Sequence, residues 1–131
     1  MPTAYLTRIV EFNATHRFPA GREFGAAAKD HGHRYQCHVT VAGAFQPEAG
    51  GVLSLAALDD LLAREVTARL DGRHLNDDLP EFADGRMLAT GEALAVYLWK
   101  RLAPQLPPGV RLHAVRIQES PHLYSEYRGE S

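Results

Sequence analysis

The chain has a single cysteine, no long apolar run and no excess of basic residues. Because Cys37 is the one cysteine in 131 residues, a disulfide scaffold is excluded and a reducing compartment is indicated. No apolar stretch has the length that a membrane span needs. The first eight residues have neither a charged leader nor an apolar core, so no secretory signal is expected. The sequence therefore predicts a cytoplasmic protein without a membrane span.

The charge of the chain argues against a nucleic-acid partner. There are 14 Lys and Arg and 16 Asp and Glu, which give a formal net charge of -2, and the basic residues are scattered along the chain. A chain of this length is typical of one domain and can bury roughly two thirds of its unfolded surface. We therefore expect a single domain over residues 1–131 that does not bind nucleic acid.

Alternation of apolar and polar side chains predicts two long strands near the start of the chain. Residues 33–45 place apolar side chains at odd positions, and residues 4–17 place them at even positions as far as His16. The other expected elements are a loop at 18–30, a turn at 46–51, a helix from Ser54 to Asp71-Gly72, a polar loop at 73–80, a helix from Thr90 to the prolines at 104–108, and strands at 110–119 and 123–128. This β-β-α-α-β-β order predicts an α+β domain whose antiparallel sheet carries two helices on one face.

Three histidines stand at the ends of the two long strands. If the second strand reaches back to His31, the rings of His31 and His33 project from one face with Cα atoms about 6.5 to 7 Å apart. His16 ends the apolar face of the first strand. Three imidazoles around one ion with an open fourth position are typical of a catalytic zinc. Ordinary hydrogen-bonded histidines are the alternative, and the spacing alone leaves both readings open; His38, His113 and His122 are interpreted as surface residues.

An ordered set of short motifs resembles the 6-pyruvoyl-tetrahydropterin synthase and 6-carboxytetrahydropterin synthase family. These motifs are Phe12-Asn13-Ala14-Thr15-His16, His31-Gly32-His33-Arg34-Tyr35, Leu70-Asp71, Leu75-Asn76, Thr90-Gly91-Glu92, Glu119-Ser120-Pro121 and Glu126-Tyr127-Arg128-Gly129. The set spans nearly the whole chain in order, and its specificity lies in the combination. The resemblance implies a tunnelling fold, in which trimers close their sheets into a barrel and two trimers form a homohexamer with sites between subunits.

The resemblance also implies a chemistry. The family acts on 7,8-dihydroneopterin triphosphate, which makes a small-molecule pterin the expected partner. Zn²⁺ would be held by His16, His31 and His33, and Glu119 would anchor the N–H donors of the pterin. Thr90 is a second candidate for substrate binding, although helix capping also explains it. Of the family's branches, the resemblance favours the 6-carboxytetrahydropterin synthase of queuosine-type biosynthesis over the 6-pyruvoyl branch.

Two departures from the family affect proton transfer. The family's basic cysteine in the loop before His31 has no counterpart in Gly25–Ala28, and no glutamate stands there either. Asp71 of the family's Asp-His pair is present, but Gly72 replaces the histidine and His74 follows two residues later. We expect His74 to act with Asp71 as the acid-base pair, and Asp30, Lys29 or zinc-bound hydroxide are the other candidate bases.

Four functions therefore remain open. The chain can be a lyase that uses another base, an aldolase-type enzyme that makes a hydroxymethyl pterin, a pterin-binding homologue without the standard activity, or an oligomeric module that binds no ligand.

Overall fold

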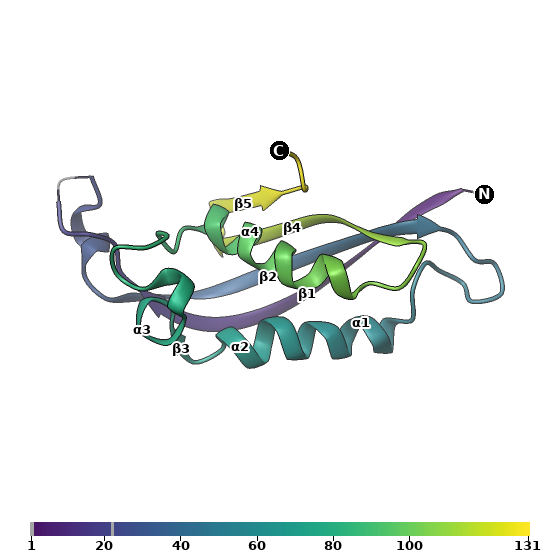
Figure 1. Ribbon diagram of the computed structural model, residues 1–131, viewed down its shortest axis with the longest axis horizontal. Coiled ribbons are helices and arrows are strands. Elements are labelled where there is room, and N and C mark those ends of the chain that lie inside the picture. Colours follow the sequence, from purple (N-terminus) through teal and green to yellow (C-terminus); the bar gives the residue numbers. More distant parts are fainter. Residues whose placement is uncertain (1, 22) are drawn as a thin grey trace.

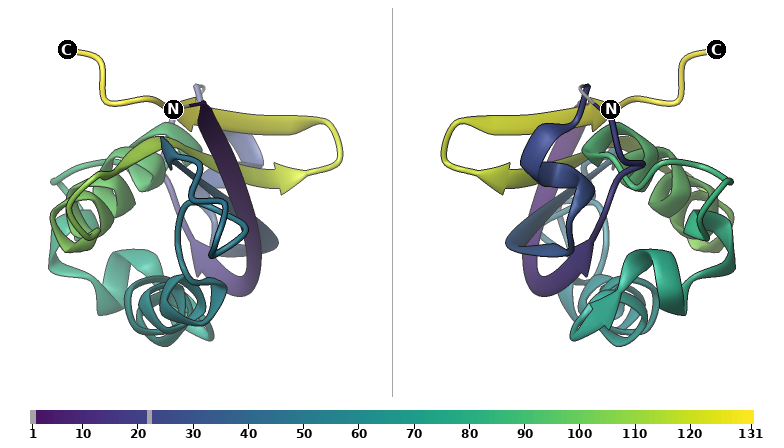
Figure 2. Two further views of the ribbon diagram at one scale, coloured as in Figure 1. Left: turned by 90° about the vertical axis from the view of Figure 1, so that its right-hand side faces the viewer. Right: turned by 90° about the vertical axis from the view of Figure 1, so that its left-hand side faces the viewer.

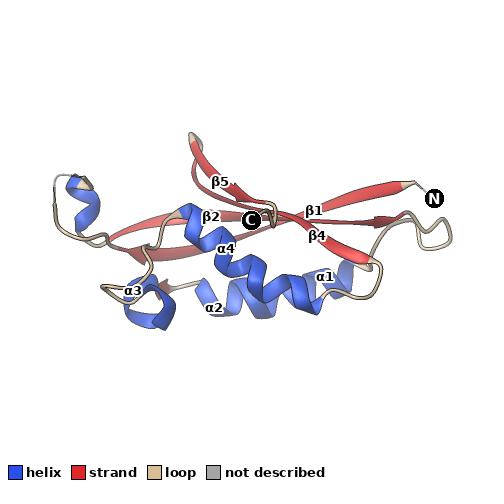
Figure 3. Ribbon diagram, turned by 45° about the horizontal axis from the view of Figure 1, so that its top comes forward, coloured by secondary structure: helices blue, strands red, loops and turns tan. Residues whose placement is uncertain are grey.

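The fold is built on a five-stranded sheet with helices on one face, as the computed structural model of residues 2–21 and 23–131 shows (Figures 1 and 3). The strands are β1 (Thr3–His16), β2 (His31–Ala44), β3 (Arg73–His74), β4 (Val110–Ser120) and β5 (Leu123–Tyr127). Their order across the sheet is β3-β1-β2-β4-β5. β3 runs parallel to β1, and the other neighbours are antiparallel. The predicted α+β architecture is confirmed.

Two helical segments cover the same face of this sheet. The first is α1 (Leu55–Leu62), which continues through a π-helical turn (Ala63–Thr67) into α2 (Ala68–Leu70). The second is α4 (Gly91–Leu102). Ser54 and Thr90 cap them, because each hydroxyl accepts a hydrogen bond from a backbone N–H three residues later. Figure 2 shows these helices gathered on one side of the sheet when the molecule is viewed end-on. Among the described residues, no helix has the length and apolar character of a membrane span.

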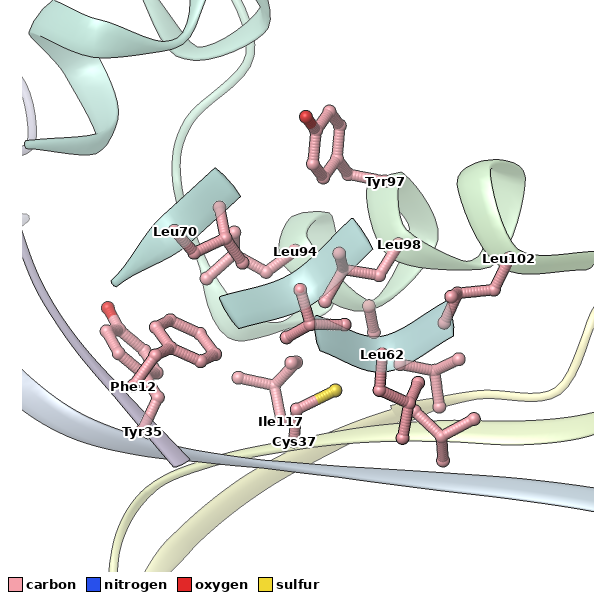
Figure 4. Close-up of a cluster of buried hydrophobic side chains, with 14 of the residues drawn as sticks. Phe12, Tyr35, Cys37, Leu62, Leu70, Leu94, Tyr97, Leu98, Leu102 and Ile117 are labelled. Carbon is pink, nitrogen blue, oxygen red and sulfur yellow. The ribbon is translucent and has the colours of Figure 1, made fainter. Parts of the chain in front are cut away.

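The hydrophobic core lies between the sheet and these helices (Figure 4). The even positions of β1 and the odd positions of β2 point into it, as the alternation predicted. Phe12 and Tyr35 stack there with ring centroids 4.9 Å apart. Cys37 is fully buried, and this burial raises the pKa of its thiol to about 12. The cysteine is therefore an apolar core residue, far from the end of the sheet that carries the histidines.

The polar loop predicted at 73–80 is instead ordered structure. It contains β3, the short helix α3 (Leu75–Asp78) and a 3-10 turn (Pro80–Phe82), so the sheet has five strands where four were expected. Long-range hydrogen bonds produce the extra strand. The Gly72 N–H donates to the carbonyl of Asn13 (2.7 Å), and the Asn13 N–H donates to Asp71 Oδ1 (2.8 Å). These bonds align residues 73–74 with the edge of β1.

The register of the long hairpin brings the histidines together. β2 begins at His31, so the expectation that the strand reaches back to this residue is confirmed. His16 pairs with His31, and Ala14 pairs with His33, so β1 ends where β2 begins. The pairing of β2 with β4 starts only at Gln36 and Gln118. The histidine end of β2 therefore extends beyond its ladder with β4.

Candidate functional site

The rings of His16, His31 and His33 converge at this end of the sheet. One potential ligand atom from each lies within 4.8 Å of the others. The ring centroids of His16 are 4.4 Å from those of His31 and 5.1 Å from those of His33, and His31 and His33 are 5.0 Å apart. The predicted convergence of three imidazoles is thus observed.

Backbone carbonyls orient two of these rings. His16 Nδ1 lies 2.8 Å from the carbonyl of Ala89, and His31 Nδ1 lies 2.9 Å from the carbonyl of Lys29. A carbonyl only accepts, so each Nδ1 carries the proton and each Nε2 keeps its lone pair. Such outer hydrogen bonds are typical of metal-binding histidines, because they fix the tautomer and the ring orientation.

The chemistry of the cluster fits a metal ion. His16 Nε2 is buried and has no hydrogen-bond partner, and such a group normally has one. Burial lowers the pKa of His16 to about 4, and the nearby His31, His33 and His74 lower it further against the opposing bond to Ala89. The ring is therefore neutral near pH 7, which is the form that binds metals. Imidazole suits zinc and also copper, iron and nickel.

Glu119 stands close to the histidines at the end of β4. Its carboxylate is half-buried, and burial raises its pKa, followed by the repulsion of Glu92. Gly91 allows α4 to approach this carboxylate, because a Cβ there would lie 2.8 Å from Ser125 Oγ and 3.6 Å from Glu119 Oε1. The Tyr35 hydroxyl is buried without a partner on the same side. Burial and the charge of Glu119 both raise the pKa of this hydroxyl.

A pocket of about 490 Å³ opens where β2 and β4 part. His33 and Glu119 both line it, together with Glu11, Gly32, Arg34, Gln36, Gln118, Ser120 and Pro121. The end of the sheet thus combines neutral imidazoles with an anionic carboxylate that no hydrogen bond within the described residues satisfies. This combination suits a ligand that carries oxygen atoms for a metal and N–H donors for Glu119.

Thr90 and Glu92 also lie at this end, at the start of α4. The Thr90 hydroxyl accepts from the Ala93 N–H at 3.1 Å, so its capping role is observed. Glu92 Oε1 accepts from Ser125 Oγ at 3.2 Å. The two residues therefore hold the start of α4 against β5, beside Glu119.

The two residues expected to form an acid-base pair bind other partners. Asp71 Oδ1 accepts the Asn13 N–H, whereas His74 Nε2 lies 2.9 Å from Asp30 Oδ1. No hydrogen bond joins Asp71 to His74 among the described residues. His74 nevertheless lies near the cluster, because its charge contributes to the lowered pKa of His16.

Arg17 organises a network that the pattern analysis missed. Its guanidinium lies 3.3 Å from Asp30, 2.8 Å from Asp77 and 2.7 Å from Asp84. The hydrogen bonds and charges of these carboxylates raise the pKa of Arg17. The bond from His74 and that from Arg17 lower the pKa of Asp30. The only sequence signal was an arginine directly after His16, and the acidic partners are spread over three separate segments.

Comparison with known proteins now identifies the family. Residues 5–130 match the family described as 6-pyruvoyl tetrahydropterin synthase. The chain belongs to the 6-pyruvoyl tetrahydropterin synthase family. The 6-pyruvoyl tetrahydrobiopterin synthase of Homo sapiens is 36% identical over 97% of this chain and 92% of its own length. That of Poecilia reticulata is 35% identical over 96% and 90%.

A solved structure of the 6-pyruvoyl tetrahydropterin synthase family shares the fold over almost the full length. The 6-pyruvoyl tetrahydropterin synthase of Caenorhabditis elegans is 27% identical, has a TM-score of 0.87, and is matched over 99% of this chain and 98% of its own. The family resemblance and the tunnelling fold that it implied are thereby confirmed, and the chain is a lyase-family member of pterin biosynthesis.

Proposed function

We propose that the protein is a zinc-dependent lyase that acts on 7,8-dihydroneopterin triphosphate. Family membership and the identity of 36% to a human synthase support this substrate. The observation that carries the proposal is the buried, unpartnered Nε2 of His16 beside the rings of His31 and His33. The curated relatives are named as 6-pyruvoyl synthases, which supports that product. The 6-carboxy product of queuosine-type biosynthesis is the alternative within the same reaction class.

The proposed reaction is an elimination. A base removes a proton from the side-chain carbon next to the one that carries the triphosphate, the C–H electron pair forms a C=C bond, and triphosphate leaves with the electrons of the C–O bond. His16, His31 and His33 would hold the zinc ion through their three Nε2 atoms. When bound, zinc would polarise side-chain oxygen atoms of the substrate and so ease removal of the proton.

Glu119 is proposed to fix the pterin ring. Its carboxylate can accept two N–H donors in parallel, which is a strong and directional form of recognition. Its raised pKa reflects a carboxylate whose negative charge is poorly solvated, and an N–H donor of the ligand would relieve this. Thr90 is proposed to contribute to the same pocket from the start of α4, which packs beside Glu119.

Asp71 and His74 are proposed to support proton transfer from the β3 side of the site. Asp71 holds the end of β1 through the Asn13 N–H, so its contribution is to place the strand that carries His16. His74 reaches the site through its bond to Asp30. Both roles differ from a direct Asp71–His74 pair.

Assembly into a hexamer of two trimers is part of the proposal. The sheet has free edges at β3 and β5, and such edges need pairing or cover. On β5, Leu123 and Tyr124 are 53% and 55% exposed. Sedimentation of the purified protein at the mass of six chains would agree with this assembly, and a stable monomer would contradict it. A cytoplasmic location stays a prediction from the single cysteine.

The missing base supports a second candidate function. Gly25–Ala28 forms a 3-10 turn of glycine and alanine, so no side chain in it can move a proton. A pterin-binding homologue without the standard activity, or an aldolase-type enzyme that makes a hydroxymethyl pterin, is therefore the alternative.

The products of one incubation separate these functions. Purified protein with zinc and 7,8-dihydroneopterin triphosphate should release triphosphate and yield a pyruvoyl or carboxy pterin by mass. A hydroxymethyl product would instead favour the aldolase reading, and bound but unchanged substrate would refute both enzyme readings. Glu119→Gln should lose pterin affinity while it keeps zinc, and Glu48→Gln, at an exposed residue in the turn before Gly51, is the matched control.

A further inference from the structure

The segment that leads into β2 carries one carboxylate, that of Asp30, directly before His31. Its side chain is 62% exposed. His74 Nε2 lies 2.9 Å from Asp30 Oδ1, and Arg17 lies 3.3 Å from the same oxygen. Both contacts go to Oδ1, so Oδ2 remains free to meet a ligand at the rim of the histidine cluster.

Hydrogen bonding fixes the tautomer of His74. The backbone N–H of Asp77 donates to His74 Nδ1 at 3.2 Å, so Nδ1 must carry a lone pair. The proton of the neutral ring therefore sits on Nε2, and Nε2 donates to Asp30. Both ring nitrogens are committed within the chain: one caps α3 and the other holds the carboxylate. His74 has no lone pair left for a substrate proton, whereas Asp30 has one on Oδ2.

The same network is anchored to the histidine cluster. His16 and His31 are paired across the hairpin, and Arg17 follows the first while Asp30 precedes the second. Arg17 is held in turn by Asp77 (2.8 Å) and by its own N–H, which donates to Asn76 Oδ1 at 2.8 Å. Asp30 is therefore tied to the cluster on both sides: through the chain to His31, and through Arg17 to His16.

We propose that Asp30 is the proton acceptor of the reaction and that His74 and Arg17 are its positioning residues. This inference rests on the proposed function. In the elimination, Asp30 Oδ2 takes the proton from carbon, the C–H electron pair forms the C=C bond, and triphosphate leaves with the C–O pair. The proton then passes to solvent, because the carboxylate is mostly exposed. The side chain that the Gly25–Ala28 turn lacks is thus supplied two residues after it.

Asp30→Asn is the direct test. The amide keeps the size of the side chain but is no base, so kcat should fall by about 10² to 10⁴ while KM changes little. Bound zinc should stay at the wild-type level. Asp60→Asn, the same change at an exposed carboxylate of α1, should behave as wild type. Added formate should restore part of the activity of Asp30→Gly. An Asp30→Asn variant as active as Asp60→Asn would overturn the inference.

A measurement on the resting protein separates this inference from the proposed function. Nitrogen NMR of the His74 ring should show the form protonated at Nε2, and Asp30→Ala should remove the hydrogen-bond shift of that N–H. A ring protonated at Nδ1 would overturn the arrangement even in an active enzyme. A wild type that releases no triphosphate would refute the proposed function and the catalytic part of the inference together. Normal turnover by Asp30→Asn would refute the inference alone.

Discussion

Removal of the metal should lower the unfolding temperature by an amount that the structure allows us to estimate. In the metal-free protein, His16 Nε2 is buried without a partner, and a bound ion would supply one. A ligand that binds only the folded state at 100 times its Kd stabilises that state by about 2.7 kcal/mol. At roughly 2.1 cal/mol/K per residue, 131 residues give an unfolding entropy of about 0.28 kcal/mol/K. The expected rise in Tm is therefore about 10 °C.

The assay is thermal unfolding of chelator-treated protein across a zinc titration, with Kd measured separately by calorimetry. His31→Ala removes one of three ligands and should abolish most of the rise. His122→Ala is the matched control, because this histidine is exposed in the turn between β4 and β5. A rise of equal size in His31→Ala and wild type would refute the assignment of the three ligands. So would a wild type whose Tm does not respond to zinc at 100 times its Kd.

Three further predictions concern stability. The pKa of Cys37 is raised to about 12 from 9, so its stabilising contribution is complete below pH 9 and is lost as the pH rises towards 12, by at most about 1.4 kcal/mol per pH unit; Cys37→Ala should lose this decline in denaturant unfolding at pH 8 and pH 10.5. Thr90→Ala removes the cap of α4 and should cost about 1 kcal/mol in the same assay, whereas Thr90→Ser should keep most of it. Tyr35→Phe removes a buried hydroxyl without a partner and should leave the free energy of unfolding unchanged or raise it by about 1 kcal/mol.

Each of these has a clear contrary outcome. The same decline with pH in Cys37→Ala as in wild type would place the responsible group elsewhere. Equal losses in the Ser and Ala variants at position 90 would show that the hydroxyl does not cap the helix. A Tyr35→Phe variant that is clearly less stable would show that the hydroxyl has a partner.

Local patterns were sufficient to predict the long hairpin and the histidine cluster. The alternation along residues 4–17 and 33–45 reflects a sheet with one covered face, so it indicated both the strands and the face that carries His16 and His33. The caps at Ser54 and Thr90 were predictable because each involves a backbone N–H only three residues away. Features set by the nearest neighbours in the chain are visible in the sequence.

The missed features all depend on contacts between distant segments. β3 exists because Asp71 and Gly72 bond to Asn13, which lies 58 residues from Asp71. The bond between His74 and Asp30 spans 44 residues, and those of Arg17 to Asp77 and Asp84 span 60 and 67. No periodicity records such pairs. The expected Asp71–His74 pair rested on nearness in the sequence, whereas the fold turns the two side chains towards different partners.

X-ray absorption at the zinc edge tests the proposed metal centre most directly. Protein purified with zinc should contain one ion per chain, with three imidazole nitrogens at about 2.0 to 2.1 Å and one further light ligand. A pterin substrate should change only that fourth ligand. A sulfur neighbour at about 2.3 Å, or zinc below one ion per two chains that His31→Ala does not reduce, would contradict a centre built from His16, His31 and His33.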